Sequence, residues 1–268
     1  MNQLTERTEA ATQYTAFEVL SAAMDIGQYM IKYGSEVHRV EDTVTRICRA
    51  YGADRVEIWA IDSMISATAY MPNGDSSTQT RRISSSTNHL ARLEALNNLS
   101  REICATVPSP SEVHKKISEI RDLRPIHPVL RCICGALGAG AFAIFFGGCM
   151  LDALAAAVIG ALMTVLIHID VINLNAMMCS FILSFFNGIL ASVFHAVGFG
   201  DNLDKIAIGT IMLVIPGMAF SNALRDIMYG DTASGTMGFS KALMCAMMVV
   251  LGYSAAFLLF GGLSSILA

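Results

Sequence analysis

Long apolar runs in the second half of the chain constrain its fold more than any other feature. Five runs are almost free of charged residues, and they cover 129–149, 151–169, 174–198, 205–220 and 239–263. A helix needs about 20 mostly apolar residues to cross the hydrocarbon core of a bilayer. The runs are too long for strands and do not alternate, and amides in lipid must be bonded within a helix. The sequence therefore predicts a polytopic α-helical membrane protein with about five transmembrane helices.

Charged residues divide the chain into two parts. Residues 1–125 carry 14 of the 18 Lys and Arg residues and 16 of the 22 Asp and Glu residues, whereas 126–268 carry the remaining 4 and 6 and contain no Glu. With 54% hydrophobic and 15% charged residues and a mean hydropathy of +0.53, the chain has the composition of a membrane protein. We expect a soluble domain over 1–125 and a transmembrane domain over 126–268.

The amino-terminal stretch "MNQLTERTEAATQYTAFEVL" is polar and acidic, and it lacks the basic start and apolar core of a signal peptide. We therefore expect the soluble domain to be made before the first span and to stay in the cytosol. The cations near the spans agree with this orientation. Arg121, Arg124 and Arg131 flank the first span, while Arg225 and Lys241 bracket the connection between the fourth and fifth. Both groups fall on the cytosolic side under the positive-inside rule.

The soluble domain is predicted to be a small sheet covered by helices, an α/β (α+β) arrangement. Apolar spacing predicts helices over 15–34, 35–51, 88–105 and 110–123, and turn signals delimit strands over 55–61, 64–70 and 79–84. Gly34 is suited to end the first helix, and Ser35 is suited to cap the second. Apolar residues at steps of three and four predict the buried face of that second helix: Val37, Val40, Val44, Ile47 and Tyr51.

Several kinds of site find no support in the sequence. The seven cysteines are scattered, and Cys132-x-Cys134 lacks a second pair at metal-ligand spacing. Four histidines of the first half lack metal-ligand or triad spacing and are interpreted as solvated or capping residues: His38, His89, His114 and His127. A net charge of −4 without a basic stripe argues against a nucleic-acid partner. We expect no metal and no cofactor.

The fourth apolar run is broken within "LVIPGMAFSNALRDIMYGDTASGT", Leu213 to Thr236. Pro216 removes a helical hydrogen bond, and Gly217 adds freedom to the backbone. Asn222, Arg225 and Asp226 follow within about one helical turn of one another on one side. Because polar groups at membrane depth are costly and irregular backbone there faces a cavity, we expect a substrate or proton path. The alternative is a proline kink beside a cytosolic loop, with Arg225 reaching to the interface.

Other polar residues in the spans are secondary candidates for this path: His168, Asp170, Asn187 and His195. His168 and Asp170 lie at the inner end of the second span, where an imidazole that titrates near neutral pH is suited to relay protons. A position at the membrane interface explains the same two residues equally well. Asn187 and His195 lie within the third span.

Four segments carry a resemblance to a known family. They are "YGSEVHRVEDTVTRICRAYG", the block "VEIWAIDSMISATAY" with "TQTRRISSSTNHLARLEALNNLSREI", the short "IHPVL", and "IPGMAFSNALRDIMYGDTASGTMGFSKAL". The last contains the signature Pro-Gly-x-x-x-x-Asn-x-x-x-Asp-x-x-x-Gly-Asp-x-x-x-Gly. Together they resemble the threonine/serine exporter superfamily, and specifically its short, split branch of YjjP-like succinate-exporter subunits. The resemblance covers nearly the whole chain.

The resemblance implies an inner-membrane exporter with a cytosolic amino-terminal domain and five spans. It implies small-molecule substrates, either threonine and serine or C4-dicarboxylates such as succinate, moved by the proton motive force. The sequence agrees in lacking the glycine-lysine loop of an ATPase. Split relatives pair with a second small membrane subunit (YjjB-like), so such a partner, a homo-oligomer, or both are expected. The signature selects these positions: Pro216, Gly217, Asn222, Asp226, Gly230, Asp231 and Gly235.

The chain departs from the family at one point. Many relatives have an Arg soon after the final glycine of the signature, whereas Thr236-Met237-Gly238-Phe239 follows here and Lys241 is the nearest cation. Two alternative functions assign the main role to the soluble domain. One is a membrane-anchored hydrolase, although the sequence contains no "GxSxG" nucleophile elbow. The other is a sensor or docking module that gates the pore.

Overall fold

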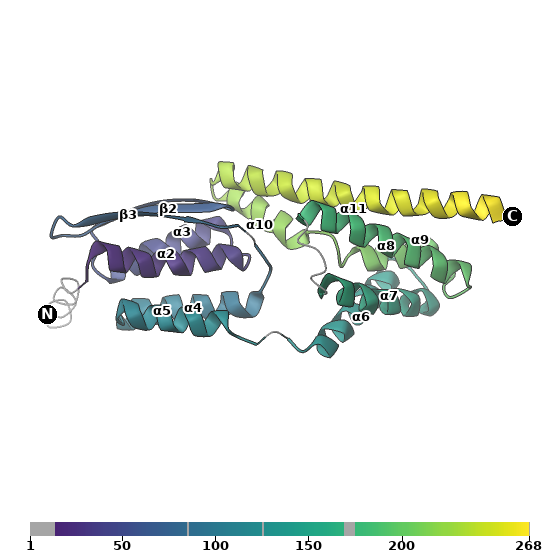
Figure 1. Cartoon of the computed structure of the whole chain (residues 1–268), viewed down its shortest axis with the longest axis horizontal. Helices are drawn as coiled ribbons and strands as arrows, with labels where there is room; N and C mark the ends of the chain where they lie inside the picture. Colours follow the sequence, from purple (N-terminus) through teal and green to yellow (C-terminus); the bar gives the residue numbers. More distant parts are fainter. Residues whose placement is uncertain (1–13, 85, 125, 169–174, 268) are drawn as a thin grey trace. The chain divides into compact units, whose positions relative to one another are not determined.

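The computed structural model describes residues 14–84, 86–124, 126–168 and 175–267. Contacts between residues divide the chain into two units (Figure 1). The first unit comprises Met1–Arg124 together with Met218–Phe239, and the second comprises Pro125–Gly217 together with Ser240–Ala268. The division at 124 lies next to the boundary expected from the charges. The expected transmembrane domain, 126–268, includes 218–239, and the contacts group these residues with the first unit.

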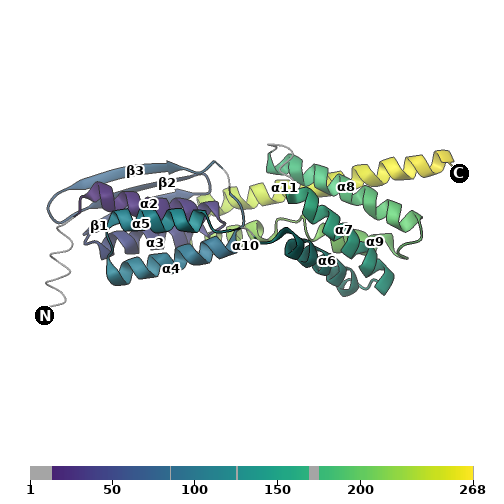
Figure 2. The ribbon, with the colours of Figure 1, turned by 60° about the horizontal axis from the view of Figure 1, so that its bottom comes forward.

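The first unit contains the helices and strands that the sequence predicts. They are α2 (Ala16–Lys32), α3 (Val37–Ala50), β1 (Arg55–Ile61), β2 (Met64–Tyr70), β3 (Ser76–Arg82), α4 (Leu90–Thr106) and α5 (Pro110–Arg121). The strands form one antiparallel sheet in the order β1-β2-β3, in which Ala67 pairs with Ile58 on one side and Gln79 on the other. Helices α2 and α3 lie between the sheet and the pair α4–α5 (Figures 1 and 2).

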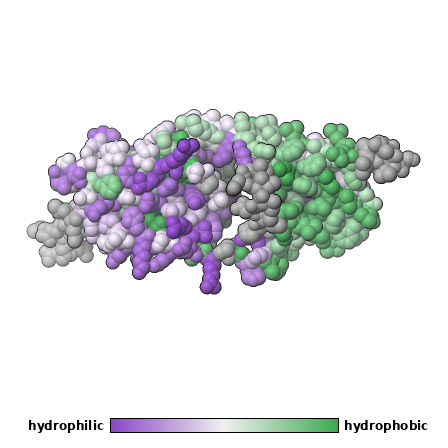
Figure 3. Space-filling view, viewed as in Figure 1, coloured by the Kyte–Doolittle hydropathy of each residue, from purple (hydrophilic) through white to green (hydrophobic). Residues whose placement is uncertain are grey.

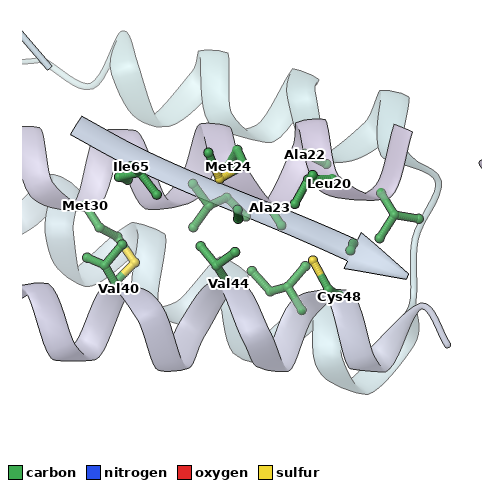
Figure 4. Packing of buried hydrophobic residues seen from close by; sticks show 14 of the residues in the cluster. Leu20, Ala22, Ala23, Met24, Met30, Val40, Val44, Cys48 and Ile65 are labelled. Carbon is green, nitrogen blue, oxygen red and sulfur yellow. The ribbon is translucent and has the colours of Figure 1, made fainter. Parts of the chain in front are cut away.

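The core of the first unit forms where α2 and α3 face each other and the sheet. Figure 4 shows Val40 and Val44 of α3 with Met24 of α2 and Ile65 of β2, and all four side chains are fully buried. At Gly27 of α2, an added Cβ would lie 2.8 Å from a methyl group of Val44, so the glycine is what lets α2 and α3 approach this closely. The predicted apolar face of α3 is confirmed.

The connection between α2 and α3 is partly as the sequence predicts. Gly34 follows the end of α2 with φ of 91°, and its amide and that of Ser35 donate to carbonyls of the last turn, so it ends the helix as predicted. The predicted cap at Ser35 is wrong. Its hydroxyl bonds to the carbonyl of Glu36, and Glu36 occupies the N-cap position without a capping bond from its side chain. Other residues bind the first amides of α3.

The second unit is built from long apolar helices. It contains α6 (Pro128–Phe145), α7 (Met150–His168), α8 (Ala176–Ala196) and α9 (Leu203–Ile211). Two further helices, α10 (Gly217–Met228) and α11 (Thr232–Leu267), are divided between the units. Residues 218–239 of these helices and their turn belong to the first unit, and α11 belongs to the second unit from Ser240. Four helices of the described chain are long and apolar enough to cross a membrane: Pro128–Phe145, Met150–Ile167, Ala176–Ala196 and Thr232–Phe260. The face of the second unit visible in Figure 3 is mostly hydrophobic, whereas that of the first is mostly hydrophilic.

The fourth predicted span, 205–220, is not one continuous helix. Helix α9 has nine residues, which extend for only about 14 Å against a hydrocarbon core of about 30 Å. Residues 212–216 are not helical, and α10 begins at Gly217 directly after Pro216. A proline lacks the amide hydrogen that a helix needs, which explains the break. The described residues thus contain four helices long and apolar enough to span, with a short, broken segment at the place of the fourth expected span, and the number of spans stays a prediction.

Small residues bring α6 and α7 together as a tight hairpin. An added Cβ at Gly160 would lie 2.7 Å from Ala139, and one at Gly140 would lie 3.0 Å from the carbonyl oxygen of Ala153. Asp152, in the first turn of α7, is fully buried and binds loop amides. Its carboxylate accepts from Cys149 N at 2.9 Å and from the amides of Asp201 and Asn202 at 2.7 and 2.9 Å. It thereby joins the α6–α7 loop to the α8–α9 loop.

Candidate functional site

Three polar residues of the signature bind the start of α3 within the first unit. Asn222 donates from Nδ2 to the carbonyl oxygen of Gly34 at 3.0 Å. Asp226 Oδ1 accepts from the amide of Val37 at 3.1 Å and is 3.5 Å from the amide nitrogen of His38. The guanidinium of Arg225 forms an ion pair with Glu36. These contacts connect residues about 190 positions apart in the chain, and we call them the α10–α3 docking contact.

The sequence of α10 explains why these side chains act together. Asn222, Arg225 and Asp226 are spaced three and four residues apart, which places them on one face of a helix. The helix ends where Gly230 takes φ of 99°, with its amide donating to Ile227 O at 3.1 Å and that of Asp231 to Asp226 O at 2.9 Å. Helix α11 then begins at Thr232, so α10 and α11 form a hairpin with a very short turn.

Gly235 allows α10 and α11 to pack closely. An added Cβ there would lie 2.8 Å from the carbonyl oxygen of Ala223 and 2.8 Å from the backbone nitrogen of Ile227. Both contacts are to backbone atoms of α10, which have no room to move aside without shifting the helix. The signature glycines therefore have separate structural roles, since Gly230 forms the turn and Gly235 lets the two helices approach.

Asp226 supplies the cap that α3 lacks. The first amides of a helix have no partner within the helix, and they carry a partial positive charge. In most helices a Ser, Thr, Asp or Asn at the N-cap accepts from them. Here the carboxylate of Asp226 accepts instead from the amides of Val37 and His38, so the cap comes from α10. Helix α3 is complete at its start only while α10 is docked.

Burial makes the carboxyl group of Asp226 a weaker acid than an ordinary aspartic acid. Its side chain is only 4% exposed, and burial raises the pKa of this carboxyl to about 6. The two amide hydrogen bonds lower that pKa, while the negative charges of Asp62 and Asp231 raise it further. Glu41 lies in the same field, and burial raises its pKa. The amide of Ala60 donates to Glu41 at 2.8 Å and lowers that pKa. The charges of Asp231 and Asp226 raise it. We call Glu41, Asp62, Asp226 and Asp231 the acidic cluster.

His38 lies beside the acidic cluster. Its ring stacks on Tyr229, with centroids 4.5 Å apart and planes 7° apart, and its Nδ1 is 4.0 Å from an oxygen of Asp231. That same carboxylate oxygen of Asp231 and the hydroxyl of Ser234 are buried without a hydrogen-bond partner among the described residues. The cluster therefore combines excess negative charge with unsatisfied polar atoms, and groups of this kind are typical of a site that exchanges protons or binds a cationic group.

The structure brings some of the predicted site residues together and leaves others apart. Asn222, Arg225, Asp226 and Asp231 meet at the α10–α3 docking contact. Pro216 and Gly217 lie at the break before α10, and nothing lies within 4 Å of a Cβ added at Gly217. Asp170 lies outside the described residues, and His168 is the last residue of α7.

The remaining two candidates lie on α8 in the second unit. The ring Nδ1 of His195 is 3.0 Å from Gly200 O and so holds the loop after α8. Asn187 is fully buried in the middle of the helix.

Sequence reasoning missed the partners of α10. Gly34, Glu36, His38 and Glu41 all lie in the segment "YGSEVHRVED", but from the sequence His38 is interpreted as a solvated or capping residue, and no role is assigned to Glu36 or Glu41. Local spacing shows that these residues share a helix and its approach. It does not show that a segment some 190 residues later completes them. In the described residues, no group of three or more His, Cys, Asp or Glu side chains is arranged to hold a metal ion.

A family model described as "Putative threonine/serine exporter" matches residues 21–260. The chain belongs to this family. The match runs from α2 into α11 and includes both sides of the α10–α3 docking contact. No curated protein and no solved structure matches the chain. Membership makes the protein a membrane exporter of threonine- or serine-like substrates, within a family of transporters.

Proposed function

We propose that the chain exports threonine and serine across the plasma (inner) membrane, that its first unit faces the cytosol, and that the proton motive force drives export. The α10–α3 docking contact carries this proposal. The signature residues Asn222, Arg225 and Asp226 come directly after the break at Pro216 and bind the soluble domain. This arrangement joins the interrupted segment of the membrane part to a structure that senses cytosolic conditions.

The docking contact acts as a latch in this proposal. While Asp226 and Asn222 bind the start of α3, α10 is held; when they let go, the chain at 212–217 is free to rearrange. Backbone groups freed by Pro216 are tolerated at membrane depth only beside protein or water, so the broken segment is suited to line the solute path. The gating role of the soluble domain, an alternative at the level of sequence, thereby becomes part of the export mechanism.

The direction of proton linkage follows from the pKa of Asp226. Burial in the docked state raises this pKa to about 6, whereas an undocked, hydrated carboxyl has the ordinary value of 3.8. The docked state therefore holds the proton more tightly, so protonation favours docking and proton loss favours release. A proton that reaches Asp226 is readily lost at a cytosolic pH above 6. Each turnover then couples proton release to release of α10.

Charge favours an amino acid over a C4-dicarboxylate. The acidic cluster places four carboxyl groups in one region, and the guanidinium of Arg225 is already paired with Glu36. A dianion such as succinate is repelled by this field, whereas the ammonium group of threonine or serine is attracted to it. The absence of the family's Arg after Gly235 points the same way.

We also propose that the working exporter contains further chains, either a second small membrane subunit or additional copies of this one. A nine-residue α9 cannot cover the lipid-facing surface of a full span, and large apolar side chains such as Leu137 and Phe145 are 67% and 78% exposed. Purification of the complex in mild detergent, followed by mass measurement, tests this proposal. A mass equal to one copy of this chain, in an active preparation, contradicts it.

Export is tested in cells that lack other threonine exporters and are loaded with a threonine-containing dipeptide. We expect this chain, with its partner where one is needed, to raise external threonine and serine. Asp226→Asn is expected to reduce export at least about tenfold, because the carboxyl can no longer carry a proton. Asp42→Asn is the matched control, since Asp42 lies on α3, is exposed and pairs with Arg46. Export of succinate without threonine contradicts the proposed substrate, and a silent Asp226→Asn contradicts the proposed latch.

A further inference from the structure

Asn187 is an unsatisfied amide in the interior of the second unit. It lies near the middle of α8 and is fully buried, and neither its Nδ2 nor its Oδ1 has a hydrogen-bond partner among the described residues. Leaving a buried polar group unpaired costs about 1–3 kcal/mol in a protein interior. The other polar residues on this buried face are satisfied, since Ser192 donates to Gly188 O at 2.9 Å and Ser184 to Phe181 O at 3.1 Å. Asn187 is the exception on its face.

The surroundings of Asn187 are closed by glycine contacts. At Gly188, the next residue, an added Cβ would lie 2.7 Å from Ala256 and 3.2 Å from a ring carbon of Tyr253, so α8 packs closely on α11. At Gly252 of α11, an added Cβ would lie 2.5 Å from Phe181 O. Contacts of this kind leave no space for a solute between the two helices in this structure.

Further hydrogen-bonding groups lie beside this contact. The hydroxyl of Tyr253 is 3.1 Å from that of Thr210 on α9 and 3.3 Å from Ala207 O. Helix α8 contains no Asp, Glu, Lys or Arg, with His195 in its last turn, and residues of these charged types lie at the starts of neighbouring helices: Asp152 on α7, and Asp204 with Lys205 on α9. The region around Asn187 thus offers hydroxyl and amide groups without net charge. The groove between α7 and α8 offers a polar solute no hydrogen bond, because Leu162, Val165, Leu166, Phe186, Ile189 and Leu190 line it.

We infer that Asn187 is the mid-membrane binding residue for the solute, and that this solute is a zwitterionic amino acid. This inference rests on the proposed export function. When α8 and α11 separate, Nδ2 is placed to donate to the carboxylate and Oδ1 to accept from the ammonium group. A dicarboxylate has no donor for Oδ1, and its two charges are costly in a region without cations. The unpaired amide of the closed state is then satisfied by the cargo.

Replacement of Asn187 by leucine separates binding from structure. Asn187→Leu removes an unpaired amide at similar volume, so the purified protein in detergent is expected to melt at the same temperature as the wild type or higher. Threonine is expected to raise the melting temperature of the wild type and not that of Asn187→Leu, and succinate to raise neither. Ser192→Ala, on the same face with a satisfied hydroxyl, is the control and is expected to keep the threonine response. Asn187→Ser keeps a polar group but loses the amide. It is expected to raise, at least about tenfold, the threonine concentration needed for the same rise in melting temperature.

The outcomes distinguish this inference from the proposed function. Loss of the threonine response in Asn187→Leu, with its own melting temperature preserved, supports the inference even if the wild type exports no amino acid in cells. An unchanged threonine response in Asn187→Leu and Asn187→Ser overturns it, even if the wild type exports threonine. A wild type whose melting temperature responds to succinate and not to threonine also overturns it.

Discussion

Asp226 lies where α10 meets the start of α3, two segments about 190 positions apart in the chain. Its carboxyl is buried, accepts from two amides of α3 and lies in the field of Asp62 and Asp231. The group both completes a helix and titrates near neutral pH.

Asp226→Asn is expected to change the pH dependence of stability. The folded protein holds a proton on Asp226 up to a pH of about 6, and the unfolded chain only up to about 3.8. The contribution of this group to the free energy of unfolding therefore falls as pH rises from about 4 to about 6 and is constant above. Melting curves of the wild type and Asp226→Asn in detergent, from pH 4.5 to 7.5, are expected to diverge across this window, with the variant becoming relatively more stable as pH rises. Parallel curves contradict the assigned pKa, and Asp42→Asn is again the control.

Arg225 and Glu36 allow a charge-swap test of the docking contact. Arg225→Glu replaces the cation that pairs with Glu36 by a second carboxyl group and is expected to reduce export several-fold. The double variant Arg225→Glu with Glu36→Arg restores opposite charges and is expected to recover at least half of the lost export. Export measured in the dipeptide-loaded cells gives the readout. If the double variant exports no better than the single, the ion pair has no functional role.

At the scale of residues, the sequence predicted the polar face of α10 but not its partner. The spacing of Asn222, Arg225 and Asp226 is local information and was sufficient to group them. The cap of α3 was assigned to Ser35 because a local serine commonly fills that role. The actual cap is 189 positions away from Val37, and no local pattern encodes such a contact.

At the scale of elements, substitution of Gly235 and of Gly217 by alanine is expected to have opposite outcomes, although both glycines belong to the signature. Gly235→Ala places a methyl group 2.8 Å from two backbone atoms of α10, so α10 must move away from α11. We expect export to fall at least about tenfold. We also expect the free energy of unfolding to fall by about 1–3 kcal/mol, the usual cost of overpacking, and the melting temperature to fall with it. Gly217→Ala meets no atom within 4 Å and is the control for a small added side chain. Equal effects of the two substitutions contradict the assigned packing role of Gly235.

Most elements followed from the sequence, and the fourth span shows why one did not. Apolar periodicity and turn residues predicted α2 to α5 and the three strands because each buries one face. In 205–220 the hydropathy of Ile211 to Ile215 suggested a span, but Pro216 ends the helical hydrogen bonding and the polar face of α10 finds partners on α3. Hydropathy measures preference for lipid, and it does not register that the polar face of α10 binds the start of α3 within the first unit.

At the scale of the whole molecule, the proposed latch is tested by linking α10 covalently to the start of α3. In a cysteine-free background, Glu36→Cys with Arg225→Cys places two thiols where the ion pair lies, and a short reducible bifunctional thiol reagent is expected to join them. Joined protein in proteoliposomes with an imposed proton gradient is expected to lose transport, and a reducing agent to restore it. Each single cysteine variant treated alike is the control. Full transport by the joined protein shows that α10 stays docked throughout the cycle and contradicts the latch.

The borrowed cap of α3 also has a consequence for the order in which the protein is made. Val37 emerges from the ribosome long before Asp226, and at about 5–20 residues per second the interval is of the order of 10–40 s. During that time α3 has an incomplete first turn, and most of the apolar helices must be inserted before its final partner arrives. A product that stops before α10 therefore lacks the carboxylate that binds the first amides of α3, and its first turn stays without this cap.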